Sequence, residues 1–322
     1  MNNNVILIVV LSPLIIMYAG GDYMLGCYYD HYATQRHEKG KDTLRNYVPG
    51  LCTHIIFAYA GMDDLFNIEH VNFVEVRTID MHGFWEPFTG FNSPLYDRNG
   101  DHLSISTAAN YWTSKGMPKN KIMLSLATFG RSFVLVKPEN HGVGAGSTTD
   151  PNPGRYTKSE GLLSFFEICE YLESDTAVCY DDKQQGVPYA INGNKWVGYD
   201  NTYSLAAKVE WLKHNKFGGV IVFSLDLDDY IGLCGWSKGE KYPLIRTLHT
   251  SLYGNSSVAL NQKLKEPKCC PGDGLHPDTT NCRNYYYNCR LLSCGDCLVF
   301  NSDRNICDFP ERYSCKNPDT NV

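Results

Sequence analysis

The stretch from Val76 to Tyr96, VRTIDMHGFWEPFTGFNSPLY, has the side chains best suited to chemistry. Within seven residues it places Asp80, His82, Trp85 and Glu86, and a turn rich in Gly, Asn, Ser and Pro follows. Aromatic rings beside carboxylates and amides suit a carbohydrate, which offers apolar ring faces and a rim of hydroxyls. An apolar run precedes the aspartate, as expected of a buried strand that ends in a functional loop. The stretch favours a carbohydrate site, and a strand end with ordinary polar turn residues is the alternative.

The composition predicts a globular protein. The chain has 322 residues, 43% of them hydrophobic, which is enough for one large domain and a small one. Its net charge of −6 and pI near 5.9 give no indication of a nucleic-acid partner. Twenty-two tyrosines are compatible with sugar stacking, although aromatic residues also fill protein cores. We predict no cofactor and no metal.

The N-terminal residues 1–20 are typical of a secretory signal. Val5 to Met17 is apolar but too short to span a bilayer, and the small residues Ala19, Gly20 and Gly21 follow. An uncleaved anchor is the alternative. After signal cleavage we expect a secreted, extracellular protein with no membrane span. Its 13 cysteines then imply disulfides, and because the number is odd, at least one thiol is left over or pairs with another chain.

The remaining patterns predict alternating strands and helices. We expect helices where apolar residues recur on one face and strands where apolar runs are short and continuous. The predicted strands are 23–29, 54–62, 121–129, strands around 187–199, and 218–227, and the predicted helices are 102–115, 158–172 and 204–215.

The Val76–Tyr96 stretch resembles the sixth-strand motif of the family 18 glycoside hydrolases, the chitinases. That motif reads Met-x-Tyr-Asp-x-His-Gly-x-Trp-(Asp/Glu), followed by Thr-Gly-x-Asn-Ser-Pro-Leu-Tyr. The chain differs at Arg77, where the family has Met, and at Ile79, where it has Tyr. Both positions line the cleavage subsite of the family.

Other strands extend this resemblance. Residues 23–29 and 54–62 are similar to the first two strands of the family, which implies a disulfide between Cys27 and Cys52. Residues 121–131 resemble its seventh strand, and 218–229 its eighth, with Phe223 in place of a Trp that forms the floor under the scissile sugar. Residues from about 132 to 200 resemble the α+β insertion that walls one side of the sugar groove. By the same resemblance, Cys169 pairs with Cys234.

One family motif is absent from the chain. Asp-x-x-Asp-x-Asp-x-Glu, which ends the fourth strand and supplies the catalytic acid, does not occur, and the chain passes from Met62 to the sixth-strand motif in a few residues. Against a family barrel, about 140 residues are missing from a fold that normally needs about 200 or more. We therefore expect an α/β fold over residues 22–253, an incomplete (β/α)8 TIM-type barrel with about five of eight strands and the insertion domain. The second and sixth strands would become neighbours or leave unpaired edges.

The C-terminal part is a separate, cysteine-dense module over residues 269–322, joined by a polar linker at 254–268. The linker carries the only glycosylation sequon, at Asn255. The module resembles a peritrophin-type chitin-binding domain, and Tyr285, Tyr286 and Phe309 are its candidate sugar contacts. A zinc site at Cys294 and Cys297 is a competing interpretation that lacks a second ligand pair.

The resemblance also implies how the cysteines of the module pair. The six cysteines of that domain pair first with third, second with sixth and fourth with fifth. The matching residues are Cys270 (or Cys269), Cys282, Cys289, Cys294, Cys307 and Cys315. Cys297 and the second of Cys269 and Cys270 are extra and could pair together, and Cys179 has no assigned partner.

These observations predict a secreted chitin-binding protein that is similar to chitinases but has lost hydrolysis. Its partners would be chitin or N-acetylglucosamine oligosaccharides. We expect no catalytic residue, and Asp80 should be an ionised carboxylate paired with Arg131. The candidate substrate-binding residues are Tyr28, Asp80, Trp85, Arg131, Trp196 and Phe223, with Tyr32 a further possible contact. The alternatives are an active endo-chitinase, here in a shortened form, and a structural protein of a chitin matrix.

Overall fold

The computed structural model describes residues 23–30, 36, 46–58, 73–174, 176–254, 275–277, 284–287, 290–294 and 299–308. The predicted signal, the linker with Asn255, Tyr32, Phe309 and the cysteines at 270, 282, 289 and 315 lie outside these residues. None of the helices in the described ranges is long and apolar enough to cross a membrane.

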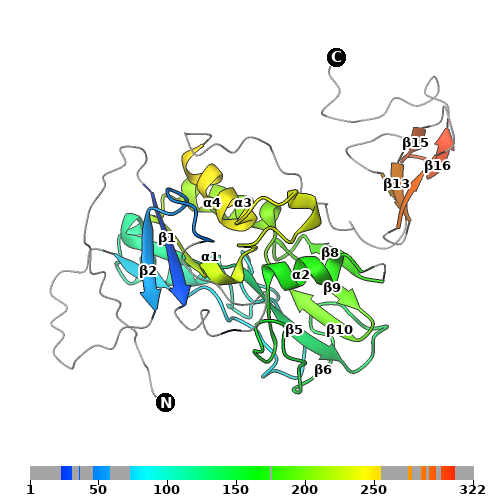
Figure 1. The fold of residues 1–322 in the computed structure, drawn as a ribbon, viewed down its shortest axis with the longest axis horizontal. Coiled ribbons are helices and arrows are strands. Elements are labelled where there is room, and N and C mark those ends of the chain that lie inside the picture. Colours follow the sequence, from blue (N-terminus) through cyan, green and yellow to red (C-terminus); the bar gives the residue numbers. More distant parts are fainter. Residues whose placement is uncertain are drawn as a thin grey trace.

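Residues 23–254 contain a parallel sheet of five strands, of which β1 and β2 are labelled in Figure 1. Its order is β2–β1–β11–β4–β3, and every neighbouring pair is parallel. The strands are β1 (Met24–Asp30), β2 (His54–Ala58), β3 (Val74–Val76), β4 (Ile122–Ala127) and β11 (Gly219–Phe223). The strands β2 and β3 follow each other in the chain, but they lie at opposite edges of this sheet and are not neighbours.

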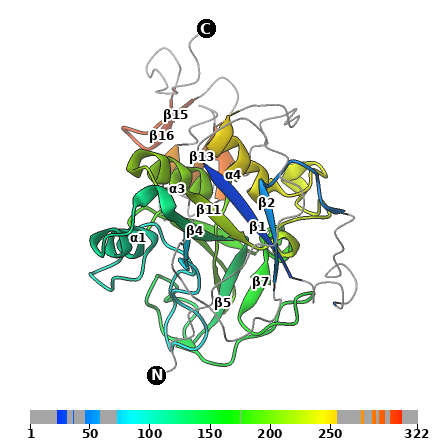
Figure 2. The ribbon, with the colours of Figure 1, turned by 90° about the vertical axis from the view of Figure 1, so that its left-hand side faces the viewer.

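The two faces of this sheet differ because side chains alternate along a strand. Leu25 and Cys27 of β1 belong to the main core, together with side chains of the helices, whereas Tyr28 points to the other, inner face and packs with Met123 and Ile221. Three of the helices that contribute to the main core are α1 (Ile105–Ser114), α3 (Thr202–Asn215) and α4 (Pro243–Tyr253). Figure 2 shows α1 and α3 outside the strands β4 and β11.

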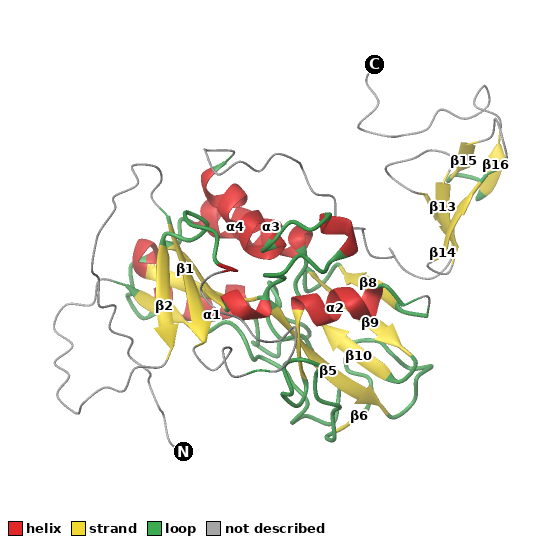
Figure 3. Cartoon of the chain, viewed as in Figure 1, coloured by secondary structure: helices red, strands yellow, loops and turns green. Residues whose placement is uncertain are grey.

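A second, antiparallel sheet follows β4 in the chain. Its order is β6–β5–β10–β9–β8, and β7 pairs with β5. Its strands are β5 (Phe129–Leu135), β6 (Ser147–Thr148), β7 (Leu162–Ser164), β8 (Val178–Asp182), β9 (Val187–Asn192) and β10 (Lys195–Gly198). Helix α2 (Phe165–Leu172) lies beside it (Figure 3). Phe165 and Ile168 of α2 and Val197 of β10 join the main core, so the two sheets share one apolar interior.

Several predicted elements are shorter in the structure. The helix predicted from residue 158 begins at Phe165, because Ser164 and Glu167 form a capping box that starts it there. Before that point the chain has positive φ at Lys158 and Gly161. The strand predicted over 218–227 ends at Phe223 and continues as a 3₁₀ turn, η5 (Leu225–Leu227). Further 3₁₀ turns are η4 (Lys119–Lys121) and η6 (Gly235–Ser237).

Three disulfides join described cysteines, and all three are pairs that the resemblance implies. They are Cys27–Cys52, Cys169–Cys234 and Cys294–Cys307. Because Cys294 is bonded to Cys307, its sulfur is not a thiolate that could bind zinc. The zinc interpretation at Cys294 and Cys297 is therefore wrong.

In the described residues of the C-terminal part, five short strands form two sheets. The three-stranded sheet is β12 (Leu275–Pro277), β13 (Asn284–Tyr287) and β14 (Arg290–Ser293), and the two-stranded one is β15 (Val299–Asn301) with β16 (Ile306–Asp308). The Cys294–Cys307 disulfide links the residue after β14 to β16. The sequence predicts a small disulfide-rich β module here, and the described residues form two small β-sheets and one disulfide.

Candidate functional site

Asp80 is at the centre of the candidate site, just past the end of β3. Its carboxylate accepts hydrogen bonds from Nε and Nη2 of Arg131, at 3.0 and 2.6 Å, and it also forms an ion pair with Arg77. Its backbone has a positive φ of 59°, and its N–H donates to Oδ1 of Asn92 at 2.8 Å. The predicted pairing of Asp80 with Arg131 is confirmed, and the carboxylate is an acceptor already shared by two guanidinium groups.

Trp85 provides an exposed aromatic surface beside this ion pair. Its side chain is 48% exposed, and the guanidinium carbon of Arg131 lies 5.3 Å from the centre of its ring. Gly83 lies against the ring, since a Cβ atom there would be 2.2 Å from it. A half-exposed indole with a cation and a carboxylate beside it can stack a sugar ring and bind its hydroxyls.

His82 and Glu86 hold the loop that carries Trp85. Nδ1 of His82 lies 2.8 Å from Oε2 of Glu86, and its Nε2 lies 3.9 Å from Asp101. His82 is buried, and Gly90 packs against its ring so closely that a Cβ would clash. Both side chains therefore stabilise the shape of the loop.

A continuous row of side chains runs from Tyr28 to Trp85. The ring centres of Tyr28 and Phe223 are 5.6 Å apart, and those of Phe223 and Phe129 are 6.1 Å apart. Arg131 lies 5.2 Å from the centre of Phe129 and so connects this row to Trp85. The structure thus brings together five of the six predicted substrate-binding residues, Tyr28, Asp80, Trp85, Arg131 and Phe223.

The Tyr28 end of this row is buried, whereas Trp85 at the other end is open to solvent. Tyr28 is 5% exposed, and its hydroxyl donates to Oε2 of Glu75 at 2.7 Å. Ile79 packs with Ala127 and Leu227 in a small apolar cluster that Phe223 borders. Among the described residues of the site, Trp85 is the most exposed, and Arg131, Asp80 and Phe223 are partly exposed.

Trp196 does not belong to the site, and its prediction as a sugar contact was wrong. It is 0% exposed and packs against Phe91, Phe133 and Tyr189 inside the antiparallel sheet. Its indole N–H donates to the carbonyl of His141 at 3.0 Å. The sequence places Trp196 in a strand but does not show which face of that strand is covered.

The candidate contacts of the C-terminal module are only partly described. Tyr285 is half-buried on β13 and lies opposite Leu292 of β14. Tyr286 belongs to the same strand, where its backbone pairs with Leu291. Their role in chitin binding, like that of Phe309, stays a prediction.

The loop of the site is anchored by an ion pair that sequence reasoning missed. Nζ of Lys208, on α3, lies 2.5 Å from Oδ1 of Asp200 and 2.5 Å from the carbonyl oxygen of Ser93. Both charged side chains are almost fully buried. Burial lowers the pKa of Lys208, and Asp200 opposes that shift. The sequence offered one signal for this pair, because Lys208 falls on the otherwise apolar face of the predicted helix 204–215.

A second ion pair connects the same loop to the antiparallel sheet. Nη1 of Arg98 lies 3.0 Å from Oδ2 of Asp182, and the N–H of Leu95 donates to the carbonyl of Gln185. The loop therefore contacts α3 on one side and the β8–β9 turn on the other.

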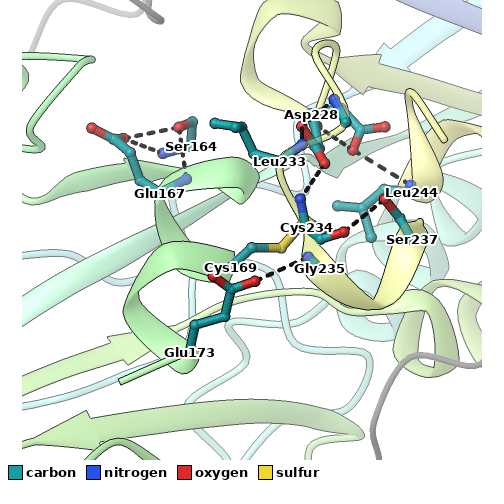
Figure 4. Close-up of a disulfide and its surroundings, with 12 residues drawn as sticks. Ser164, Glu167, Cys169, Glu173, Asp228, Leu233, Cys234, Gly235, Ser237 and Leu244 are labelled. Carbon is teal, nitrogen blue, oxygen red and sulfur yellow. Dashed lines mark hydrogen bonds between the residues drawn. A yellow bond between two sulfur atoms is a disulfide. The ribbon is translucent and has the colours of Figure 1, made fainter. Parts of the chain in front are cut away.

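Two carboxylates of the acidic run 226–229, those of Asp228 (Figure 4) and Asp229, accept backbone N–H groups. Asp228 accepts N–H groups of Leu244 and Ile245 at the start of α4, and burial raises its pKa to about 7. Asp229 accepts the N–H groups of Gly232, Leu233 and Cys234, next to the Cys169–Cys234 disulfide. These carboxylates hold a turn and a helix end. Among the described residues no group of three or more His, Cys, Asp or Glu side chains is arranged to hold a metal.

Comparison with known proteins places this site within one family. The family described as "Glycosyl hydrolases family 18" matches residues 65–228. The chain is 39% identical over 183 residues to the oviduct-specific glycoprotein of sheep (Ovis aries), covering 56% of this chain and 33% of that protein. It is 35% identical over 268 residues to chitotriosidase-1 of the mouse (Mus musculus), covering 74% of this chain and 56% of that protein. The chain thus spans about a third to about half of the length of these relatives.

Solved structures share the fold. A chitinase from Trichuris suis superposes with a TM-score of 0.65 at 22% identity, over 71% of this chain and 100% of that one. Human YKL-39, described as a pseudo-chitinase with retained chitooligosaccharide binding properties, superposes with a TM-score of 0.65 at 23% identity, over 71% and 99%. At these identities the likeness concerns the fold alone.

Proposed function

The chain belongs to the family 18 glycosyl hydrolases, and we propose that it binds chitin oligosaccharides without hydrolysing them. The observation that carries this proposal is the arrangement of Trp85, Arg131 and Asp80 at the open end of the aromatic row. A pyranose ring stacks on the exposed indole, and its hydroxyls and acetamido group meet the charged pair.

The loss of hydrolysis follows from what the site lacks. By the resemblance, the family uses the acetamido oxygen of the substrate as nucleophile and needs a Glu to protonate the leaving oxygen. The motif that supplies this Glu does not occur in the chain. Removing a general acid typically lowers the rate by a factor of about 10² to 10⁴.

Two changes in the remaining site support the same conclusion. Ile79 stands where the family has a tyrosine, and its apolar side chain has no donor for the acetamido group. Phe223 replaces the floor tryptophan and packs between Tyr28 and Phe129. Asp80, the carboxylate beside Trp85, is already shared by Arg131 and Arg77.

The wider proposal concerns the whole chain. We propose a signal at 1–20, a partial family 18 barrel at 22–253 with its insertion at about 132–200, a linker at 254–268 and a chitin-binding module at 269–322. The strand order β2–β1–β11–β4–β3 supports a partial barrel. Five neighbouring strands of an eight-stranded ring would have this order, and the three missing strands would fill the gap between β2 and β3. Disulfides on both sides of the linker support secretion.

The test is to measure binding and turnover on one preparation of the full chain. Isothermal titration with soluble hexa-N-acetylchitohexaose should show binding, and mass spectrometry after long incubation should show the intact hexasaccharide only. Tyr285→Ala should weaken retention on insoluble chitin and leave oligosaccharide binding unchanged. Release of shorter oligosaccharides would overturn the loss of hydrolysis, and absence of binding by a folded protein would overturn the lectin role.

A second candidate function is that of an active endo-chitinase whose shorter form is described here. The strand order favours it, since three further strands between β2 and β3 would complete a ring of eight. Sequencing the transcript across the segment from Met62 to Val76 separates the two. A message with the Asp-x-x-Asp-x-Asp-x-Glu motif would support the enzyme, and the short message alone would support the lectin.

A further inference from the structure

The cysteine that the sequence left without an assigned partner is in a disulfide in the structure. Cys179 lies on β8, where its backbone pairs with Ala190 of β9, and it is half-buried against the main core. Its sulfur is disulfide-bonded. The edge of the antiparallel sheet therefore carries a covalent link.

The partner of this link is restricted by elimination. Six cysteines outside Cys179 are described, and they bond to one another in the pairs Cys27–Cys52, Cys169–Cys234 and Cys294–Cys307. The chain has 13 cysteines, and the remaining six all lie between residues 269 and 315. They are Cys269, Cys270, Cys282, Cys289, Cys297 and Cys315. Every cysteine available to Cys179 within the chain is thus in the C-terminal module.

We infer that a disulfide from Cys179 ties the C-terminal cysteine-rich module to the edge of the antiparallel sheet. The pairing implied for a peritrophin-type module leaves Cys297 and one of Cys269 and Cys270 as extra cysteines, so one of these is the expected partner. In the reaction two thiols lose two electrons and two protons, and the disulfide of a thiol–disulfide oxidoreductase accepts both and becomes a dithiol. Secretion exposes the chain to such an oxidant.

The tether changes how the two regions act together. The bonded residues are at least 90 positions apart in the sequence, so the bond closes a long loop around the linker. The module then stays near the antiparallel sheet instead of moving with the full freedom of the linker, which raises its effective concentration there. The bond also leaves seven of the eight cysteines of the module for other pairings.

Peptide mapping of the secreted protein tests the link directly. After the free thiols are alkylated, trypsin and Glu-C together release the peptide Ser174–Lys183, which contains Cys179 and not Cys169. Without reduction this peptide should be joined to a peptide from 269–315, and the mass identifies which one. An alkylated Cys179, or a bond from it to any other peptide, overturns the inference.

A second experiment tests in the intact protein whether a disulfide joins the module to the rest of the chain. A site for a specific protease is placed in the linker at 255–268, and the cut protein is analysed without reduction. The wild-type fragments should stay joined until a thiol reductant is added, whereas those of Cys179→Ser should separate. The matched control is the double variant Cys169→Ser, Cys234→Ser, whose fragments should stay joined.

The two proposals fail separately. If the cut wild-type fragments separate without reductant, the tether does not exist, and oligosaccharide binding at Trp85 is unaffected by that result. If the fragments stay joined but the titration shows no binding, the tether stands and the proposed function falls.

Discussion

The hydroxyl of Tyr28 on β1 donates a 2.7 Å hydrogen bond to Oε2 of Glu75 on β3, three strands away in the same sheet. In a flat sheet these strands would lie about 14 Å apart, with their side chains roughly perpendicular to the sheet. A direct bond between them requires the five strands to curl around their inner face. Ser125 on the neighbouring β4 donates to the other oxygen of Glu75 at 2.8 Å, so both oxygens of this carboxylate are bound.

We predict that Tyr28→Phe lowers the free energy of unfolding by about 1 to 2 kcal/mol, because it removes one hydrogen bond to a carboxylate. Urea unfolding of both proteins measures this. In a double-mutant cycle with Glu75→Gln, the coupling energy should be at least about 0.5 kcal/mol. A variant as stable as the wild type would show that this bond does not hold the curled sheet.

Trp85→Ala should weaken binding of the hexasaccharide roughly tenfold, because it removes the exposed stacking surface. The control is Trp112→Ala on α1, which removes an indole of similar exposure, 40% against 48%, outside the site. Titration calorimetry of both variants gives the comparison. Equal affinities for the two variants would move the binding surface away from Trp85.

Lys208→Met should lower the free energy of unfolding by about 3 to 5 kcal/mol, because it leaves the buried Asp200 carboxylate without its partner. It should also weaken oligosaccharide binding, since the carbonyl of Ser93 loses its anchor. The exposed Glu210 on the same helix provides the control, and Glu210→Gln should change stability by about 0.5 kcal/mol or less. Chemical unfolding and titration of both variants measure these effects, and equal stabilities would contradict the prediction.

Asp228 should make the protein less stable as the pH rises. Burial raises its pKa in the folded protein from 3.8 to about 7, against the N–H donors that favour its ionised form. Between these values the folded state holds a proton that the unfolded chain has released, so the contribution to stability falls from about pH 4 to about pH 7 and is constant above.

The pH experiment compares Asp228→Asn with the wild type. From pH 5 to pH 8 the wild type should lose about 2 to 3 kcal/mol more unfolding free energy than the variant. Asp150→Asn, which changes an exposed aspartate, should keep the wild-type slope. Parallel slopes for the wild type and Asp228→Asn would show that this carboxyl is ionised throughout.

The sequence by itself determined the family and the local chemistry of the site. The spacing around Asp80, the pairing of Asp80 with Arg131 and the disulfides Cys27–Cys52 and Cys169–Cys234 were all predicted from motifs. These features depend on residues close together in the chain or on a spacing shared with the family.

Only the tertiary structure decided which side chains of different strands and helices contact one another. Trp196 was predicted to contact sugar, but its strand is covered on both faces, and burial of its ring in the antiparallel sheet excludes it. Glu75 lies between two valines in an apolar strand, and nothing near it in the sequence indicates Tyr28 as its partner. Which face of a strand is covered, and which distant residues converge there, depends on how sheets curl and pack, and that is a property of the whole chain.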